Sequence, residues 1–216
     1  MPAAQIDALV IGGGQAGLGV SRELGARGVE HLVLEQGRIG ETWRSQRWDA
    51  FALNSPAWMN RLPADAEPLD PDEFPSAQQF VASLRRYAFR HRLPVREGLA
   101  VRAVRVGTTD DFLSVTTGEG LFEARSVVVA SGGARVPRIP TMASALPRRV
   151  LQLHTATYRN AGDLPAGAVL VVGGSPTPIA PPHRSPVSPP AIEPVRATPR
   201  PNGRANPAAT QSGKVR

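Results

Sequence analysis

The sequence predicts an α/β fold, and three features near its N-terminus lead to that prediction. A short apolar run at residues 6–11 meets glycines at once, which is typical of a buried strand that enters a turn. Helix-forming residues follow at 15–27 and stop before Gly28. A second apolar run at 31–35, which ends in an acid, completes a β-α-β unit of about thirty residues. Because such a unit joins parallel strands, we expect a parallel sheet at the centre of the fold.

The next stretch, residues 38–75, is rich in Trp, Pro and Asn, and we expect loops with short turns there. A helix should follow, because Ser76 is a good N-cap and apolar residues then recur on one helical face up to about Arg92. These apolar residues are Phe80, Leu84, Tyr87 and Ala88. Pro94 cannot continue a helix and should end it.

Four short segments rich in valine come next, at residues 101–106, 113–117, 121–124 and 126–130. Gly, Asp and Thr separate them, which is typical of strands joined by turns. We expect a β-meander that returns to the main sheet. The first domain should then span residues 1–167.

Gly12, Gly14 and Gly17 form a G-x-G-x-x-G pattern between the first predicted strand and the first predicted helix. The first glycine allows a tight turn, the second lets the backbone approach a pyrophosphate, and the third lets helix and strand pack closely. The phosphates would lie at the helix N-terminus, where free N–H groups and the helix dipole favour anions. We therefore count Gln15 and Ala16, which open this helix, among the cofactor-binding residues.

Glu35, at the end of the second apolar run, stands where an acid accepts hydrogen bonds from the two hydroxyls of a ribose. Its carboxylate would repel a 2′-phosphate. FAD or NAD therefore fits this site better than NADP, and we expect Gln36, the next residue, to contact the cofactor as well.

A last apolar run at residues 168–172 again leads into glycines, as a second unit of this kind would. We expect a buried strand over 168–174, the remnant of an incomplete second dinucleotide domain. Half of the 22 prolines lie in residues 175–216, where each removes a backbone donor and blocks the preceding helical turn. This Pro/Arg-rich tail has few large apolar residues, so we expect it to be disordered.

Composition and charge exclude several classes of function. Six basic residues against one acid give the tail +5 of the total +7, so the first 174 residues carry about +2, and we expect no nucleic-acid binding. The absence of cysteine excludes a disulfide reductase and cysteine-ligated zinc, and we expect no metal site. Because there is no apolar run of about 18 residues and no basic cluster before residue 9, we expect no membrane span and a cytoplasmic location.

Six short segments stand in an order that is more specific than any one of them. They read IGGGQAG at 11–17, GETWR at 40–44, RWD at 47–49, LNSP at 53–56, VVVASG at 127–132 and HTATYRN at 154–160. In this order, together with Pro137 and Pro140, they resemble the class B flavoprotein monooxygenases. This NADPH-dependent, flavin-containing monooxygenase group includes Baeyer–Villiger enzymes and plant auxin-forming enzymes. The resemblance covers residues 5–174.

The resemblance implies a Rossmann-like FAD-binding domain and places several residues around the flavin. Gly40, Thr42 and Trp43 would pass along the flavin side of the pocket. Asn54, the one catalytic candidate, would lie near the isoalloxazine and support it by a hydrogen bond, because an amide does not act as an acid or base. Two alternatives stay open: Asn54 as a turn residue before Ser-Pro, and core packing for Trp43 and, with more weight, Trp48.

Val101, Ala130, Ser131 and Gly132 complete the cofactor-binding residues, and Ser131 and Gly132 match the segment A-T-G that closes the family's FAD domain. In this family NADPH reduces FAD, and the reduced flavin activates oxygen for transfer to a substrate. The implied cofactors are FAD and NADPH, and we expect no catalytic triad.

His154 stands in what remains of the family signature F-x-G-x-x-x-H-x-x-x-W. Arg148 and Val150 replace its Phe and Gly, and Tyr158 replaces its final aromatic residue. A linker role and a functional role both stay open for His154.

The family's second glycine fingerprint should begin at Gly173 or Gly174, but proline-rich sequence follows these residues. We therefore expect a truncated or frameshifted flavin monooxygenase that is inactive alone, with an organic substrate and an oligomeric state that the residues do not specify. One alternative is a noncatalytic FAD-domain fragment whose basic tail binds acidic partners. Another is a small NAD-dependent reductase that uses the single nucleotide-binding unit.

Overall fold

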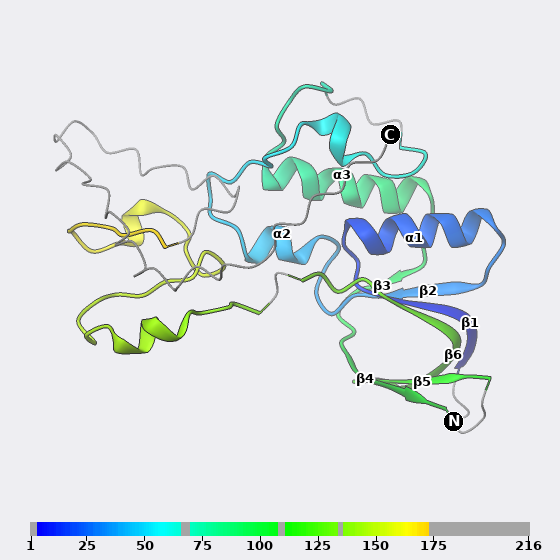
Figure 1. The fold of residues 1–216 in the computed structure, drawn as a ribbon. Coiled ribbons are helices and arrows are strands. Elements are labelled where there is room, and N and C mark those ends of the chain that lie inside the picture. Colours follow the sequence, from blue (N-terminus) through cyan, green and yellow to red (C-terminus); the bar gives the residue numbers. More distant parts are fainter. Residues whose placement is uncertain (1–3, 66–69, 108–110, 134–135, 173–216) are drawn as a thin grey trace, which may run out of the picture. The chain divides into compact units, whose positions relative to one another are not determined.

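A six-stranded sheet forms the centre of the fold, in the order β3-β2-β1-β6-β5-β4 (Figure 1). The computed structural model describes residues 4–65, 70–107, 111–133 and 136–172. The strands are β1 (Ala4–Ile11), β2 (His31–Leu34), β3 (Val95–Arg96), β4 (Val101–Val106), β5 (Leu113–Thr117) and β6 (Gly120–Val129). β1 pairs in parallel with β2 and with β6, and β2 pairs in parallel with β3. β5 pairs antiparallel with both β4 and β6. The α/β class and the β-α-β unit that the sequence predicts are confirmed.

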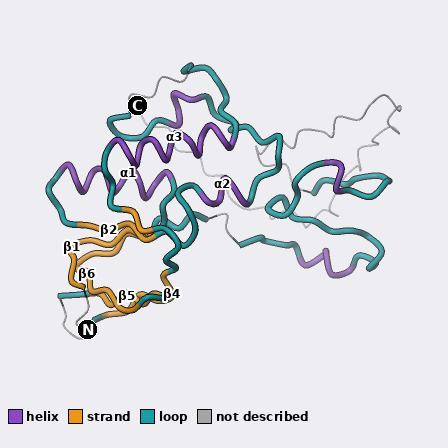
Figure 2. Tube along the Cα trace, turned by 180° about the vertical axis from the view of Figure 1, so that it is seen from behind, coloured by secondary structure: helices purple, strands orange, loops and turns teal. Residues whose placement is uncertain are grey.

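Two helices cover one face of the parallel strands, as the two opposite views agree (Figures 1 and 2). α1 (Gln15–Ala26) connects β1 to β2 and buries Leu18 completely. α3 (Ala77–Arg90) begins at the predicted N-cap: the Ser76 hydroxyl accepts from the Gln79 N–H, and the Gln79 side chain accepts from the Ser76 N–H. This capping box satisfies two backbone donors of the first turn. No helix in the described ranges is both long and apolar enough to cross a membrane.

The apolar core has two parts. The first lies beneath α1 and α3 and contains Leu18, Ile39, Trp48, Phe51, Leu53, Phe80, Leu84, Tyr87 and Ala88. The second lies where the parallel strands meet the meander and contains Leu9, Leu34, Leu99, Val115 and Ala124. Trp48 is only 6 % exposed and belongs to the first part, so it packs in the core.

The β-meander forms as predicted, but its last two predicted segments are one strand. β6 pairs with β5 through Gly120 to Ala124 and with β1 through Phe122 to Val129. Arg125, which lies between the two predicted segments, belongs to this strand. Its side chain lies on the surface, 3.6 Å from the Asp7 carboxylate, while its backbone continues the strand. One strand thus serves both the parallel and the antiparallel parts of the sheet.

Short elements were missed by the sequence analysis. The stretch expected as loops with short turns contains the 3₁₀ turn η1 (Ala57–Asn60), in line with that expectation, and also the single-turn helix α2 (Glu41–Ser45), which was not predicted. β3 has only two residues, too few for an alternating pattern. Such elements are set by their tertiary neighbours rather than by local periodicity.

Residues 168–172 do not form the buried strand that the sequence predicts. They have no regular secondary structure, and Val169, Leu170, Val171 and Val172 are 51–82 % exposed. A buried parallel strand needs a paired neighbour and cover on both faces, and no described strand pairs with this segment. Two 3₁₀ turns, η2 (Thr141–Ala145) and η3 (Ala161–Asp163), precede it. The predicted disordered tail and Gly173–Gly174 lie outside the described residues.

Candidate nucleotide-binding site

The loops that follow β1, β2 and β6 meet at one edge of the sheet. Ile11, the last residue of β1, is in register with Leu34 of β2 and Val129 of β6. The Gly12 N–H donates to the Leu34 carbonyl (2.9 Å), and the Ala130 N–H donates to the Ile11 carbonyl (2.8 Å). In parallel α/β sheets, ligands bind outside the carboxyl ends of the strands. The Gly-rich turn, the loop with Glu35 and the segment of residues 130–132 are therefore brought together where a nucleotide would bind.

Gly12 and Gly17 are glycines because the turn leaves no room for a side chain. Gly12 has φ +116°, and a Cβ there would lie 2.4 Å from the Ala130 carbonyl oxygen. A Cβ at Gly17 would lie 1.9 Å from the Gly12 carbonyl oxygen. The tight turn at the first glycine and the close packing at the third are as the sequence predicts.

Gly14 is different, because it faces open space. It is the N-cap of α1 with extended backbone, and a Cβ there would meet no heavy atom within 4 Å. The first turn of α1 contains no acid, and the N–H groups of a first turn have no partner inside the helix. Gln15 donates its side-chain amide to the Asn60 carbonyl (3.2 Å), and Ala16 is exposed. The N-terminus of α1 therefore offers N–H donors, and no carboxylate in its first turn competes with a ligand for them.

Glu35 is 8 % exposed and holds two loops together. Its Oε2 accepts from the Gly13 N–H (2.6 Å) and its Oε1 from the Gly37 N–H (2.8 Å). Each carboxylate oxygen has a further lone pair, so these bonds leave capacity for a ribose hydroxyl. The ribose contact stays a prediction, and the bracing of the glycine turn is a role that sequence reasoning missed.

The loop after β2 also fixes the start of the meander. The Leu99 N–H donates to the Glu35 carbonyl and the Gly98 N–H to the Gly37 carbonyl, both at 2.9 Å. Val101 begins β4 just beyond these bonds and packs against the second part of the core, whereas Gln36 is exposed.

The predicted flavin-side segment starts beside the glycine turn. Gly40 is buried at φ +72°, and its N–H donates to the Gly13 carbonyl (3.2 Å). Thr42 is half-buried in α2. Trp43 lies against Phe80, with ring centroids 5.0 Å apart in an edge-to-face arrangement. These contacts show that Trp43 packs on α3, and its flavin role stays a prediction.

Asn54 is exposed and follows the buried Leu53, whose N–H donates to the Pro75 carbonyl (2.8 Å). At the neighbouring turn, the Ser55 hydroxyl donates to the Asn60 side-chain oxygen (3.0 Å). At the strand edge, Ser131 and Gly132 are exposed as well. The roles of Asn54, Ser131 and Gly132 as cofactor-binding residues stay predictions.

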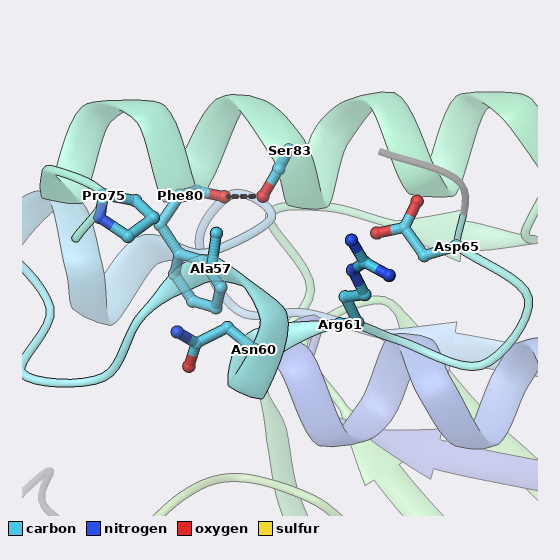
Figure 3. Close-up of a pocket in the computed structure, with 7 residues that line it drawn as sticks. All are labelled: Ala57, Asn60, Arg61, Asp65, Pro75, Phe80 and Ser83. Atoms are coloured by element: carbon cyan, nitrogen blue, oxygen red, sulfur yellow. Dashed lines mark hydrogen bonds between the residues drawn. The ribbon is translucent and has the colours of Figure 1, made fainter. Parts of the chain in front are cut away.

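A small cavity lies between η1 and α3 (Figure 3). Its volume is about 20 Å³, close to the space that one water molecule needs. The lining residues are Ala57, Asn60, Arg61, Asp65, Pro75, Phe80 and Ser83. The Ser83 hydroxyl donates to the Phe80 carbonyl (2.7 Å) rather than into the cavity. This cavity is too small for an organic substrate.

The strand edge has the arrangement of a dinucleotide-binding β-α-β unit. Residues 9–179 match the model of the pyridine nucleotide-disulphide oxidoreductases, and the chain belongs to this family. Since its 216 residues contain no cysteine, they carry no dithiol centre.

Individual relatives connect the chain to flavin monooxygenases. It is similar to the CzcO-like oxidoreductase of Geobacillus kaustophilus, with 36 % identity over 169 residues that cover 78 % of this chain and 48 % of that protein. It is similar to the indole-3-pyruvate monooxygenase YUCCA1 of Oryza sativa subsp. japonica, with 32 % identity over 77 % of this chain and 41 % of that protein. A solved flavin-containing monooxygenase from Stenotrophomonas maltophilia superposes with a TM-score of 0.59 at 28 % identity, over 73 % of this chain and 47 % of that one.

These comparisons confirm the predicted fold: it resembles the Rossmann-like FAD-binding domain of flavin monooxygenases. The chain spans about half the length, or less, of the relatives that it matches.

Proposed function

We propose that this chain is the FAD-binding part of an NADPH-dependent flavin monooxygenase and that the adenosine and pyrophosphate half of FAD binds at the N-terminus of α1. The observation that carries the proposal is the strand edge itself. There, a turn closed by Gly12 and Gly17 leaves Gly14 open to a ligand, with the carboxylate of Glu35 2.6 Å from the same turn.

The residues present fit a dinucleotide. Anionic phosphates suit a helix N-terminus that has an open glycine and no acid in its first turn. A buried carboxylate just after the adjacent strand suits ribose hydroxyls and disfavours a 2′-phosphate. This combination favours FAD over NADP at this edge.

The flavin half would extend along the residues that the family resemblance assigns to it. Gly40 starts that path, because its N–H is bonded to the Gly13 carbonyl, and Trp43 continues it through α2. Asn54 would support the ring by a hydrogen bond from its neutral amide. Bound FAD would supply the redox chemistry, while the protein orients it and excludes water.

NADPH as reductant is part of the proposal, and it rests on the family. The matching family is named for pyridine nucleotides, and several relatives are monooxygenases. The carboxylate of Glu35 makes the first site unsuited to a 2′-phosphate, so NADPH would need a second site.

Titration of the purified wild-type protein with FAD and, separately, with NAD tests the proposal. Bound flavin is followed by its absorption spectrum and by the change in its fluorescence, and NAD by calorimetry. We expect saturable binding of FAD and much weaker binding of NAD. Saturable NAD binding without FAD binding would instead support a small NAD-dependent reductase.

A further inference from the structure

The segment around Arg159 is bonded to the loop that follows α2, more than a hundred residues earlier in the chain. The Arg159 guanidinium donates to the carbonyls of Ser45 and Arg47, the latter at 2.9 Å. The Asp49 N–H donates to the Arg159 carbonyl (2.9 Å). The Asn160 side-chain amide donates to the Asp49 carboxylate (2.9 Å). Four hydrogen bonds thus join residues 45–49 to Arg159 and Asn160.

Arg159 donates to a carbonyl at the end of α2 that has no donor within the helix. Ser45 is the last residue of that helix, and the final carbonyls of any helix lack intrahelical donors. A positive side chain at this end is favourable, and a planar guanidinium can donate to two acceptors at once. Arg159 therefore ends α2 from a distant part of the chain and fixes the backbone up to Arg47.

The fixed backbone in turn places an aromatic group. The Arg47 guanidinium lies 4.7 Å from the centre of the Trp43 ring and 5.4 Å from that of Phe51. The Trp43 ring also contacts Phe51 and Phe80, whose ring centroids lie 5.7 Å and 5.0 Å from its own. Burial lowers the pKa of Arg47 from its usual value, yet a guanidinium stays charged. The Arg47 side chain thus covers the Trp43 ring, while Arg159 binds the backbone of Arg47.

We propose that Arg159 and Asn160 are positioning residues that hold the end of α2 and the loop after it, residues 43–51, so that the segment around Arg159 shapes the flavin-side wall without contacting the cofactor. As far as the flavin is concerned, this inference rests on the proposed function. The bonds, the helix end and the stacked Arg47–Trp43 pair stand on geometry alone.

Comparing the binding of FAD with that of ADP tests the role toward the cofactor. ADP carries the adenosine and pyrophosphate half only, so it reports on the glycine turn and Glu35. We expect Arg159→Gln to weaken FAD binding about tenfold and to leave ADP binding within about twofold of wild type. Arg159→Lys keeps the charge and one donor, so it should recover part of the FAD affinity. Arg149→Gln, at an exposed arginine of the same segment, is the matched control and should change neither affinity.

A second measurement uses the protein without any ligand. In a Trp58→Phe background, which removes a tryptophan that is 54 % exposed, acrylamide quenching reports on Trp43 and the buried Trp48. We expect Arg159→Gln to raise the quenching constant about twofold, since Trp43 loses the cover of Arg47, and Arg149→Gln to leave it unchanged.

The two measurements separate the possible failures. If the wild type binds ADP but not FAD, the proposed function fails, and the quenching result alone decides the role of Arg159. Unchanged quenching together with equal effects on FAD and ADP would overturn the positioning role. Circular dichroism of each variant shows whether the fold is kept, and Arg159→Lys provides the test if Arg159→Gln does not fold.

Discussion

At the scale of single residues, Gly14 and Gly17 belong to one motif but are glycine for different reasons. A Cβ at Gly17 would overlap the Gly12 carbonyl oxygen, whereas a Cβ at Gly14 would enter open space. We expect Gly17→Ala to lower the free energy of unfolding by about 3 kcal/mol, because helix and strand must separate. Gly14→Ala should cost less than about 1 kcal/mol, because the backbone is already extended. Urea denaturation of both variants measures the difference, and equal losses would contradict the geometry.

Glu35 offers a second test at this scale. Replacing it with Gln leaves one oxygen for two backbone donors, and the new amide group would face an N–H. We expect Glu35→Gln to lower the free energy of unfolding by about 1–3 kcal/mol and also to weaken FAD binding. Glu30→Gln, at an exposed carboxylate at the other end of β2, is the control. A variant as stable as wild type would show that the carboxylate does not brace the two loops.

At the scale of elements, Tyr87 ties α3 to the loop before it. Its ring is fully buried, its hydroxyl donates to the Pro63 carbonyl (2.8 Å), and burial raises its pKa to about 12. An unfolded tyrosine ionises near pH 10. The unfolded chain therefore loses this proton first, and the stability that the neutral phenol provides is present below pH 10 and lost as the pH rises towards 12.

The raised pKa of Tyr87 predicts that the difference in stability between wild type and Tyr87→Phe depends on pH. The variant loses the hydrogen bond, so it should be less stable by about 1 kcal/mol at pH 9. The gap should shrink between pH 10 and pH 12, because only the wild type carries the titrating group. Chemical denaturation at pH 9 and pH 11 checks this, and a constant gap would contradict the assigned burial.

The elements also show what the sequence can and cannot predict. The β-α-β unit, the capped helix α3 and the meander follow from apolar periodicity and from turn residues, which act locally. α2, the two residues of β3 and the continuity of β6 at Arg125 depend on distant partners, so no local pattern marks them. The run at 168–172 carried a strand pattern but found no neighbour among the described strands.

The candidate site divides in the same way. Gly12, Gly17 and Glu35 could be predicted because they lie at a characteristic spacing within one β-α-β unit. Arg159 and Asn160 were not predicted, although both lie in the segment at 154–160 that contributed to the family resemblance. Their contacts to residues 45–49 join positions more than a hundred residues apart, and only the folded structure brings them together.

At the scale of the whole molecule, the chain should not sustain NADPH-dependent oxygenation alone. Hydride transfer needs the nicotinamide held against the flavin, and such positioning accounts for about 7–11 kcal/mol of a barrier. The residues that would open a second nucleotide site are exposed at 168–172 and are followed in the sequence by Pro176 and Pro178, which lack N–H groups. With FAD and NADPH supplied, we expect no flavin-dependent NADPH consumption above background. A rate of about 1 per second or faster would contradict this.

FAD retention in Gly14→Val is the most direct test of whether FAD binds at the turn of Gly12, Gly14 and Gly17. The variant should fold, because nothing of the chain lies within 4 Å of the new Cβ, but its side chain would occupy the space that the pyrophosphate needs. Gly118→Val, which adds the same side chain in equally open space at the turn between β5 and β6, is the control. We expect wild type and Gly118→Val to bind FAD alike and folded Gly14→Val to bind none. FAD bound by Gly14→Val at the wild-type stoichiometry and affinity would contradict it.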